Sequence, residues 1–211
     1  MVAETCLTKP TLIMVIGSNG IGKSVFAKRI VRSVTNSVYI EKDLINQAFL
    51  WSSRDGELTD ITRYLPPQEL IGRNTPYYRN HILFQSYHCM LMMAKQSLLL
   101  DKHPVLDCTY LRELRWGYLE TVLIPQLTGV KYALKIILLY ASSPEIVRAR
   151  IAQRGAQRDA CLIDDEQWKR LLEEQSLIPT EIEKHDHIKL DNSDFASADA
   201  NLAAALAYLR S

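Results

Sequence analysis

The amino-acid sequence predicts an α/β fold in which a parallel β-sheet is covered by helices on both faces. Five short segments with the character of strands, two of them continuous apolar runs, alternate along the chain with segments of helical periodicity. Parallel strands need long crossover connections, usually helices, so this alternation favours one sheet built from all five strands. The chain has 211 residues, which fits a single domain over 1–211, and it contains no internal repeat, linker or low-complexity segment.

The first predicted strand, Leu12 to Ile16, is followed by a glycine-rich segment and a Lys-Ser pair. Gly17, Gly22, Lys23 and Ser24 have the Walker A spacing, G-x4-G-K-[ST]. In this motif backbone N–H groups surround phosphates, the lysine reaches the β- and γ-phosphates, and the serine hydroxyl binds Mg²⁺. A helix predicted to end near Val34 follows and directs its positive end at the anion. The expected nucleotide contacts are therefore Gly17, Ser18, Asn19, Gly20, Ile21, Gly22, Lys23, Ser24 and Val25.

An acidic residue follows the second predicted strand, Ser37 to Ile40. Asp43 lies at the carboxyl end of this strand, and ligands of open α/β sheets bind at that edge. We therefore interpret Asp43 as a candidate catalytic carboxylate. A second interpretation is that Asp43 caps a helix beginning at Leu44, since Asp is a preferred N-cap residue. The two roles are compatible.

A long irregular segment, Ser52 to Pro76, follows that short helix. Long loops in compact domains are usually lids or binding segments, and the aromatic and apolar content of this one disfavours disorder. We expect a substrate-covering insert over 52–100, in which Arg73, Tyr78 and Arg79 contact the substrate.

The longest helical signal runs from Tyr77 to Leu100. Its apolar stripe predicts core positions at Leu83, Phe84, Tyr87, Met90, Leu91, Ala94 and Leu98. A second stripe is polar, and it favours a solvated face over a pocket lining; its members are Tyr78, His81, Gln85 and His88.

The third strand begins near Val105 and terminates in Asp107. Asp107 is interpreted as a Walker B-type carboxylate, placed to hold Mg²⁺ or to contact the acceptor. The alternative is an Asp that caps a turn. Arg112 and Arg115 follow closely, and arginines just past a strand end are plausible anion contacts, although they would also be ordinary on a surface helix.

An arginine-rich segment follows the fourth strand, Leu134 to Tyr140. Ser143 and Pro144 are typical of a helix start, and the arginines beyond them are Arg148, Arg150, Arg154 and Arg158. A charged run is usually a solvated face, yet in a phosphate-transfer protein such a segment is the expected lid, here 148–162. Further on, the sequence predicts a helix beginning near Asp164, a last strand from His187 to Leu190, and a helix from Phe195 to Leu209.

Composition excludes several other classes. Lys plus Arg (25) nearly balances Asp plus Glu (24), which argues against a nucleic-acid partner. The four cysteines lack C-x-x-C spacing, which disfavours a zinc site or a redox motif. No stretch approaches the length of an apolar membrane span, and the first apolar run is too short for a signal peptide. We expect a cytoplasmic protein that does not contact a membrane.

Together, these residues resemble the P-loop kinase family that includes zeta toxins, gluconate kinases, chloramphenicol phosphotransferases and polynucleotide 5′-hydroxyl kinases. The resemblance spans most of the chain and implies the P-loop NTPase fold with strand order 2-3-1-4-5, together with ATP and Mg²⁺. It implies that Asp43 receives the proton of the acceptor hydroxyl and that Asp107 is the acid at the third strand. It also implies that Arg154 and Arg158 meet the transferring phosphates and that Asn192 lies near the adenine.

The predicted function is transfer of the γ-phosphoryl group of ATP to a hydroxyl of a small molecule. Alternatives are a polynucleotide or nucleotide kinase and a regulatory module that binds ATP without transferring it. A GTPase is disfavoured because its switch and guanine motifs are missing, and an ATPase because Cys108, not Glu, follows Asp107. The predicted catalytic residues are Lys23, Asp43 and Arg154; the metal ligands are Ser24 and Asp107; the substrate contacts are Asp43, Arg73, Tyr78, Arg79, Asp107 and Arg115.

Overall fold

Five parallel strands form one sheet in the order β2-β3-β1-β4-β5. The computed structural model describes residues 4–50, 78–155, 164–174 and 176–211. Within these ranges the strands are β1 Thr11–Gly17, β2 Ser37–Glu41, β3 His103–Asp107, β4 Ala133–Tyr140 and β5 His187–Asp191. This is the strand order that the sequence resemblance implies.

Both faces of the sheet are buried, which explains why the first strand is a continuous apolar run. All seven residues of β1 are buried. Alternate side chains point to opposite faces, so Leu12, Met14 and Ile16 belong to one core cluster. Ile13 and Val15 belong to the other.

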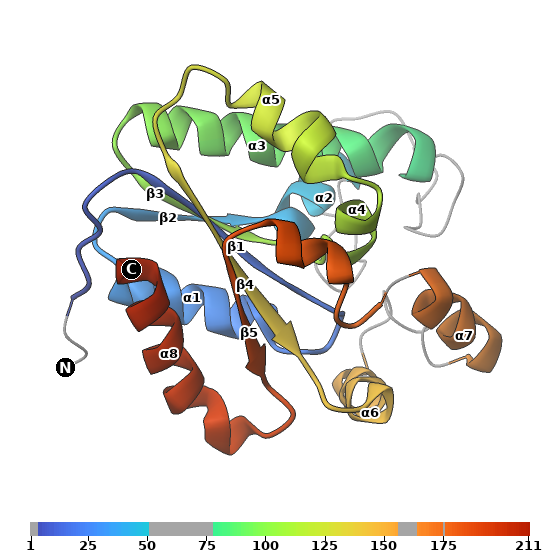
Figure 1. Ribbon diagram of the computed structural model, residues 1–211. Coiled ribbons are helices and arrows are strands. Elements are labelled where there is room, and N and C mark those ends of the chain that lie inside the picture. The colour runs from blue at the N-terminus through green and yellow to red at the C-terminus, as the bar shows by residue number, and fades with distance from the viewer. Residues whose placement is uncertain (1–3, 51–77, 156–163, 175) are drawn as a thin grey trace, which may run out of the picture.

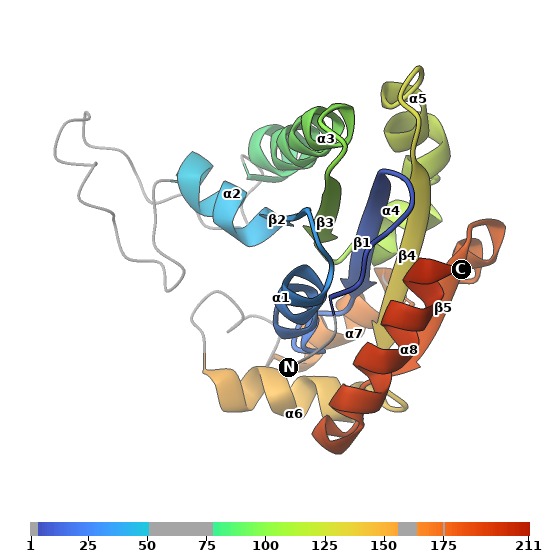
Figure 2. The same cartoon turned by 90° about the vertical axis from the view of Figure 1, so that its left-hand side faces the viewer.

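Two layers of helices cover the sheet, one on each face (Figure 1). One layer packs on Ile13 and Val15 and consists of α1 Lys23–Ser33, α6 Pro144–Arg154 and α8 Ala198–Arg210, with α7 Asp165–Glu174 beside it. The other layer contains α3 Leu83–Leu99 and the short elements α4 Leu111–Arg115, η3 Leu119–Leu123 and α5 Ile124–Gln126. Figure 2 shows α2, Lys42–Leu50, beside α3 near the β2 edge of the sheet. The remaining short helical segments are η2 Tyr78–Ile82, η5 Thr180–Lys184 and η6 Phe195–Ser197.

Strand register brings the ends of β2 and β3 to the same level, two residues before the end of β1. Asp107 of β3 is opposite Val15 of β1 and opposite Glu41 of β2. The loop after β1, the start of α2 and the residues after β3 therefore meet at one edge of the sheet. This is the edge at which open α/β sheets bind ligands.

Several sequence-based expectations about local structure were wrong. Helix α2 begins at Lys42, directly after β2, so Asp43 lies in its first turn rather than at an N-cap before Leu44. Phe84 is 50% exposed and is not a core residue, whereas the other six predicted core positions of α3 are buried. The helix predicted from Tyr77 to Leu100 is present in the described residues, as a π-helical turn, η2, followed by α3.

Part of the predicted insert belongs to the core of the fold. The buried face of α3 packs on the sheet and forms part of one core cluster. Residues 52–77 of the predicted insert, and 156–162 of the predicted lid, lie outside the described residues. Across the ranges that the structure describes, every helix falls short of the length and apolar character that a membrane span requires.

Candidate active site

The loop between β1 and α1 has the backbone of a phosphate-binding loop. Gly17 has φ 143° and Gly22 has φ 99°, conformations that favour glycine. A Cβ atom on Gly17 would lie 2.3 Å from the Leu139 carbonyl oxygen, so only glycine fits there. Helix α1 begins at Lys23, and its first turn contains no acidic residue. The positive end of this helix is therefore available to an anion.

Lys23, the first residue of α1, is partly buried, and its Nζ donates a hydrogen bond of 2.8 Å to the Ser18 carbonyl oxygen. Burial lowers the pKa of Lys23, while the charges of Asp107 and Asp43 oppose this shift and that of Arg154 adds to it. A charge interaction weakens with distance, so the effect of Asp43, Asp107 and Arg154 on Lys23 places all three in its neighbourhood, although they come from α2, β3 and α6. The three predicted catalytic residues, Lys23, Asp43 and Arg154, are thus brought together.

A tyrosine holds the Asp107 carboxylate in place. Asp107 is buried at the end of β3, and the Tyr39 hydroxyl of β2 donates to its Oδ2 at 2.7 Å. Burial, followed by the charge of Asp107, raises the pKa of Tyr39, so this hydroxyl keeps its proton. Lys28 lies over the ring of Tyr39, with Nζ 5.3 Å from the ring centroid and 3.9 Å from Oε2 of Glu41.

Asp43 is half-buried in the first turn of α2. Helix α2 follows β2 without a loop, so the strand end fixes the position of this carboxylate. The N-terminal end of a helix also stabilises a negative charge. Asp43 therefore places an acidic side chain near Lys23.

Ser24 and Asp107 suit a magnesium ion. Mg²⁺ prefers oxygen ligands and is usually held by one or two carboxylates together with substrate phosphates and water. A serine hydroxyl and a buried carboxylate are hard oxygen donors of this kind. Within the described residues, no group of three or more His, Cys, Asp or Glu side chains could hold a metal ion, so this donor set depends on a phosphate ligand.

The segment after β3 is hydrogen-bonded to the phosphate-binding loop. Thr109 Oγ1 donates to Asn19 Oδ1 at 3.3 Å, and the Gly17 N–H donates to the Thr109 carbonyl oxygen at 3.2 Å. The loop and the Asp107 region therefore form one unit.

The end of β5 is attached to the same loop from the other side. The Asn192 side-chain amide donates to the Ile21 carbonyl oxygen at 2.7 Å. Arg150 donates to the carbonyl oxygens of Asn192 at 2.8 Å and Ser193 at 2.6 Å, and its guanidinium lies 4.2 Å from the centroid of the Phe195 ring. Asn192 is thus held beside the phosphate-binding loop, and its contact with the adenine stays a prediction.

The arginines of α6 have different surroundings. Arg148 pairs with Asp165 of α7, and Arg150 holds the β5 end. Arg154 ends the helix, is exposed, and acts on Lys23. Arg158, the other predicted phosphate contact, lies outside the described residues.

The predicted substrate contacts are more dispersed. Tyr78 is buried, and its hydroxyl lies 3.4 Å from Lys42 Nζ. Arg115 ends α4 and donates to the Glu173 carbonyl oxygen of α7 at 3.0 Å. Arg73 lies outside the described residues, and so does the side chain of Arg79. Val25, predicted to contact the nucleotide, is 69% exposed on α1.

Sequence reasoning did not identify Tyr39, Lys42 and Thr109 as parts of this edge. The period-two alternation of β2 places Tyr39 and Ile40 on opposite faces of the sheet, but the sequence around Tyr39 does not indicate that it contacts a residue of β3. Lys42 precedes Asp43 and Thr109 lies two residues after Asp107, and this proximity to predicted acids was the available signal.

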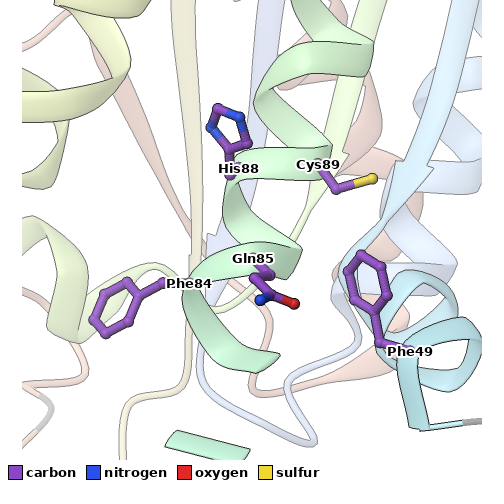
Figure 3. A pocket seen from close by; sticks show the side chains of 5 residues that line it. All are labelled: Phe49, Phe84, Gln85, His88 and Cys89. Carbon is purple, nitrogen blue, oxygen red and sulfur yellow. The ribbon is translucent and has the colours of Figure 1, made fainter. Parts of the chain in front are cut away.

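A separate pocket lies between α2 and α3. Its volume is about 470 Å³, and Figure 3 shows its lining side chains, Phe49, Phe84, Gln85, His88 and Cys89. It contains none of the predicted phosphate-binding residues. It is therefore distinct from the edge at which Lys23 and Asp107 lie.

Comparison with known proteins supplies the family. The family model described as AAA domain matches residues 12–178, which is most of the chain. The chain belongs to this AAA domain family. The resemblance of this family member to the P-loop kinases is confirmed. No curated protein matches the chain significantly.

Two solved structures share the fold of this AAA domain protein. One, from Chloroflexus aurantiacus J-10-fl, is assigned as a kinase; it is 12% identical, with a TM-score of 0.62 over 95% of this chain and 96% of that one. The other is the deoxyadenosine kinase of M. mycoides, 16% identical, with a TM-score of 0.51 over 94% of this chain and 98% of that one. At such identities the likeness concerns the fold, and it confirms the P-loop NTPase fold.

Proposed function

We propose that this protein is an ATP-dependent kinase that transfers the γ-phosphoryl group to a hydroxyl of a small molecule. The observation that carries the proposal is the convergence of Asp43, Asp107 and Arg154 on Lys23, at the end of a Walker A loop. Phosphoryl transfer requires positioning and compensation of charge more than covalent chemistry by the protein. Two acids and two cations around one phosphate-binding loop can supply both.

Each residue has a role that its surroundings support. The loop N–H groups and Lys23 bind the β- and γ-phosphates, and Arg154 compensates charge on the group in transfer. Asp43 orients the acceptor hydroxyl and accepts its proton. Ser24 and Asp107 would hold Mg²⁺, which, when bound, neutralises phosphate charge. The arginine-rich segment 148–162 remains a proposed lid.

The absence of a Glu after Asp107 supports transfer to a hydroxyl over transfer to water. ATPases of the motor and transporter classes usually place a Glu there to activate water, whereas this chain has Cys108. Burial raises the pKa of the Cys108 thiol to about 11, so at neutral pH it is protonated and cannot replace that base.

The experiment is a screen for ADP production with ATP, Mg²⁺ and separate panels of sugars, nucleosides, antibiotics and nucleotides. The proposal expects one panel to raise ADP production well above the acceptor-free rate, and expects Lys23→Ala to abolish the increase. ATP binding without any acceptor-dependent ADP would favour the regulatory module. Stimulation by nucleotides alone would identify a nucleotide kinase.

A further inference from the structure

Lys42 is a buried cation at the candidate active site to which the mechanism above gives no role. It is 8% exposed and lies between Glu41, the last residue of β2, and Asp43, the proposed base. Lysine is rarely buried unless its ammonium is paired. Its surroundings therefore need an explanation.

Aromatic side chains surround the ammonium group. Lys42 Nζ lies 4.5 Å from the centroid of the Tyr87 ring and 5.9 Å from that of Tyr78, and it donates to the Tyr78 hydroxyl at 3.4 Å. Within the described ranges of the chain it forms no ion pair with a carboxylate. Tyrosine faces attract a cation but do not neutralise it. An anion supplied from outside the chain would complete this environment, since buried charges are normally paired.

Lys42 is also close to the edge of the sheet at which Lys23 and Asp107 lie. It directly precedes Asp43 and follows Glu41, which is opposite Asp107 in the sheet register. Burial raises the pKa of Cys108, the residue after Asp107, and the charges of both Lys42 and Lys23 oppose this increase. The Cys108 thiol donates to the Tyr87 hydroxyl at 3.5 Å, so the tyrosine whose ring lies 4.5 Å from Lys42 Nζ also contacts the residue after Asp107.

We propose that Lys42 binds an anionic group of the acceptor, so that the acceptor is a hydroxyl compound carrying a phosphate or a carboxylate. The inference rests on the proposed kinase function and narrows its substrate class. Asp43 would orient the hydroxyl while the adjacent Lys42 holds the anionic group. Neutral sugars and nucleosides would lack the second contact.

The first test compares matched compounds that differ in one anionic group: ribose with ribose 5-phosphate, and glycerol with glycerate. ADP production by the wild type should have a higher kcat/KM for the anionic member of at least one pair. The pair that responds distinguishes phosphate from carboxylate. Lys42→Gln should raise the KM for that compound about 10- to 100-fold, the usual value of a charged hydrogen bond, with the KM for ATP unchanged.

Matched variants separate binding from structural damage. Lys42→Arg should keep part of the affinity that Lys42→Gln loses. If Lys42→Gln folds poorly, Lys42→Met takes its place, because a methionine side chain fits between aromatic rings, and it should show the same increase in KM. Lys102→Gln is the control, because Lys102 precedes β3 at the opposite end of the strand and contacts Asn36. Equal kcat/KM for charged and neutral members, unchanged by Lys42→Gln, would overturn the inference and leave the kinase function intact.

A second test does not depend on turnover. With the nucleotide site saturated by Mg²⁺ and a non-hydrolysable ATP analogue, low millimolar inorganic phosphate should raise the Tm of the wild type more than that of Lys42→Gln, at matched ionic strength. If no compound in the first test is phosphorylated, this comparison still decides. Equal increases in Tm for both proteins would overturn the assignment of Lys42 to anion binding.

Discussion

The Tyr39 hydroxyl donates a 2.7 Å hydrogen bond to Oδ2 of Asp107, across 68 positions of sequence. The contact joins neighbouring strands, β2 and β3, at the edge where the phosphate-binding loop lies. Because burial and the charge of Asp107 raise the pKa of Tyr39, the hydroxyl remains a donor throughout the neutral range. Tyr39 therefore positions the carboxylate that we propose as a ligand of Mg²⁺.

Replacing Tyr39 by Phe should release this carboxylate. We expect Tyr39→Phe to raise the Mg²⁺ concentration needed for half-maximal activity about 10- to 100-fold, as loss of a residue that orients a metal ligand usually does. The measurement is initial rate against Mg²⁺ concentration at fixed ATP. Tyr132→Phe, at a partly buried tyrosine that packs on the core cluster, should leave the Mg²⁺ dependence unchanged. Equal Mg²⁺ curves for wild type and Tyr39→Phe would contradict the assignment.

Lys23→Met should lower the rate of phosphoryl transfer and raise the stability of the folded protein. Transfer should fall by about 10²-fold or more because charge compensation at the phosphates is lost. Burial lowers the pKa of Lys23 below its unfolded value of 10.5, so between these two values the unfolded chain binds more protons and stability rises with pH. Below that window the charged lysine destabilises the fold, and the variant should be the more stable protein. Urea denaturation of both proteins at pH 7 and at pH 10 tests this pH dependence. The difference in unfolding free energy between Lys23→Met and the wild type must become smaller as the pH rises.

Asp43→Asn should separate catalysis from folding. Asp43 lies in the first turn of α2 and is not its N-cap, so the amide should leave the helix intact while the proton acceptor is lost. We expect kcat to fall about 10²- to 10⁴-fold, with ATP affinity and Tm close to the wild-type values. Steady-state kinetics and calorimetric titration with an ATP analogue measure the two effects. Near-normal kcat in Asp43→Asn, with transfer abolished in Asp107→Asn at unchanged Mg²⁺ binding, would assign the base to Asp107 instead.

The two arginines of α6 should respond differently to replacement. Arg150 holds the β5 end through two carbonyl oxygens, so Arg150→Gln should lower the unfolding free energy by about 1–3 kcal/mol and raise the KM for ATP. Arg154 is exposed and acts on Lys23, so Arg154→Gln should lower kcat by about 10²-fold or more with little change in stability. Denaturation curves and steady-state kinetics are measured for both variants, and each variant serves as the control for the other. Similar losses of stability in both would contradict this division.

The sequence predicted the sheet and the phosphate-binding loop because both depend on local signals. Buried parallel strands are continuous apolar runs, and the Walker A spacing fixes its own backbone. The elements between Leu111 and Gln126 were not predicted, since each is shorter than the window over which helical periodicity can be recognised. Phe84 continued the apolar spacing of α3 yet faces the pocket of Figure 3, because periodicity does not say how wide the buried stripe is.

Pairwise contacts of the site could not be read from sequence. Tyr39 with Asp107, Asn192 with Ile21, and Lys42 with Tyr87 join segments whose proximity follows from strand order and register. Adjacency of Lys42 to Asp43 was visible, but the direction of the lysine side chain toward the tyrosines was not. The sequence predicted which chemical groups gather at the edge, and tertiary structure decides how they pair.

The fate of the γ-phosphoryl group tests the central claim most directly. The protein, Mg²⁺ and γ-labelled ATP are mixed with a deproteinised small-molecule extract, and labelled products are separated from inorganic phosphate. The account predicts label on an organic compound, released by alkaline phosphatase as expected for a phosphate monoester, and none with Lys23→Ala. Label that appears only as inorganic phosphate at an undiminished rate without the extract would identify an ATPase and contradict the account.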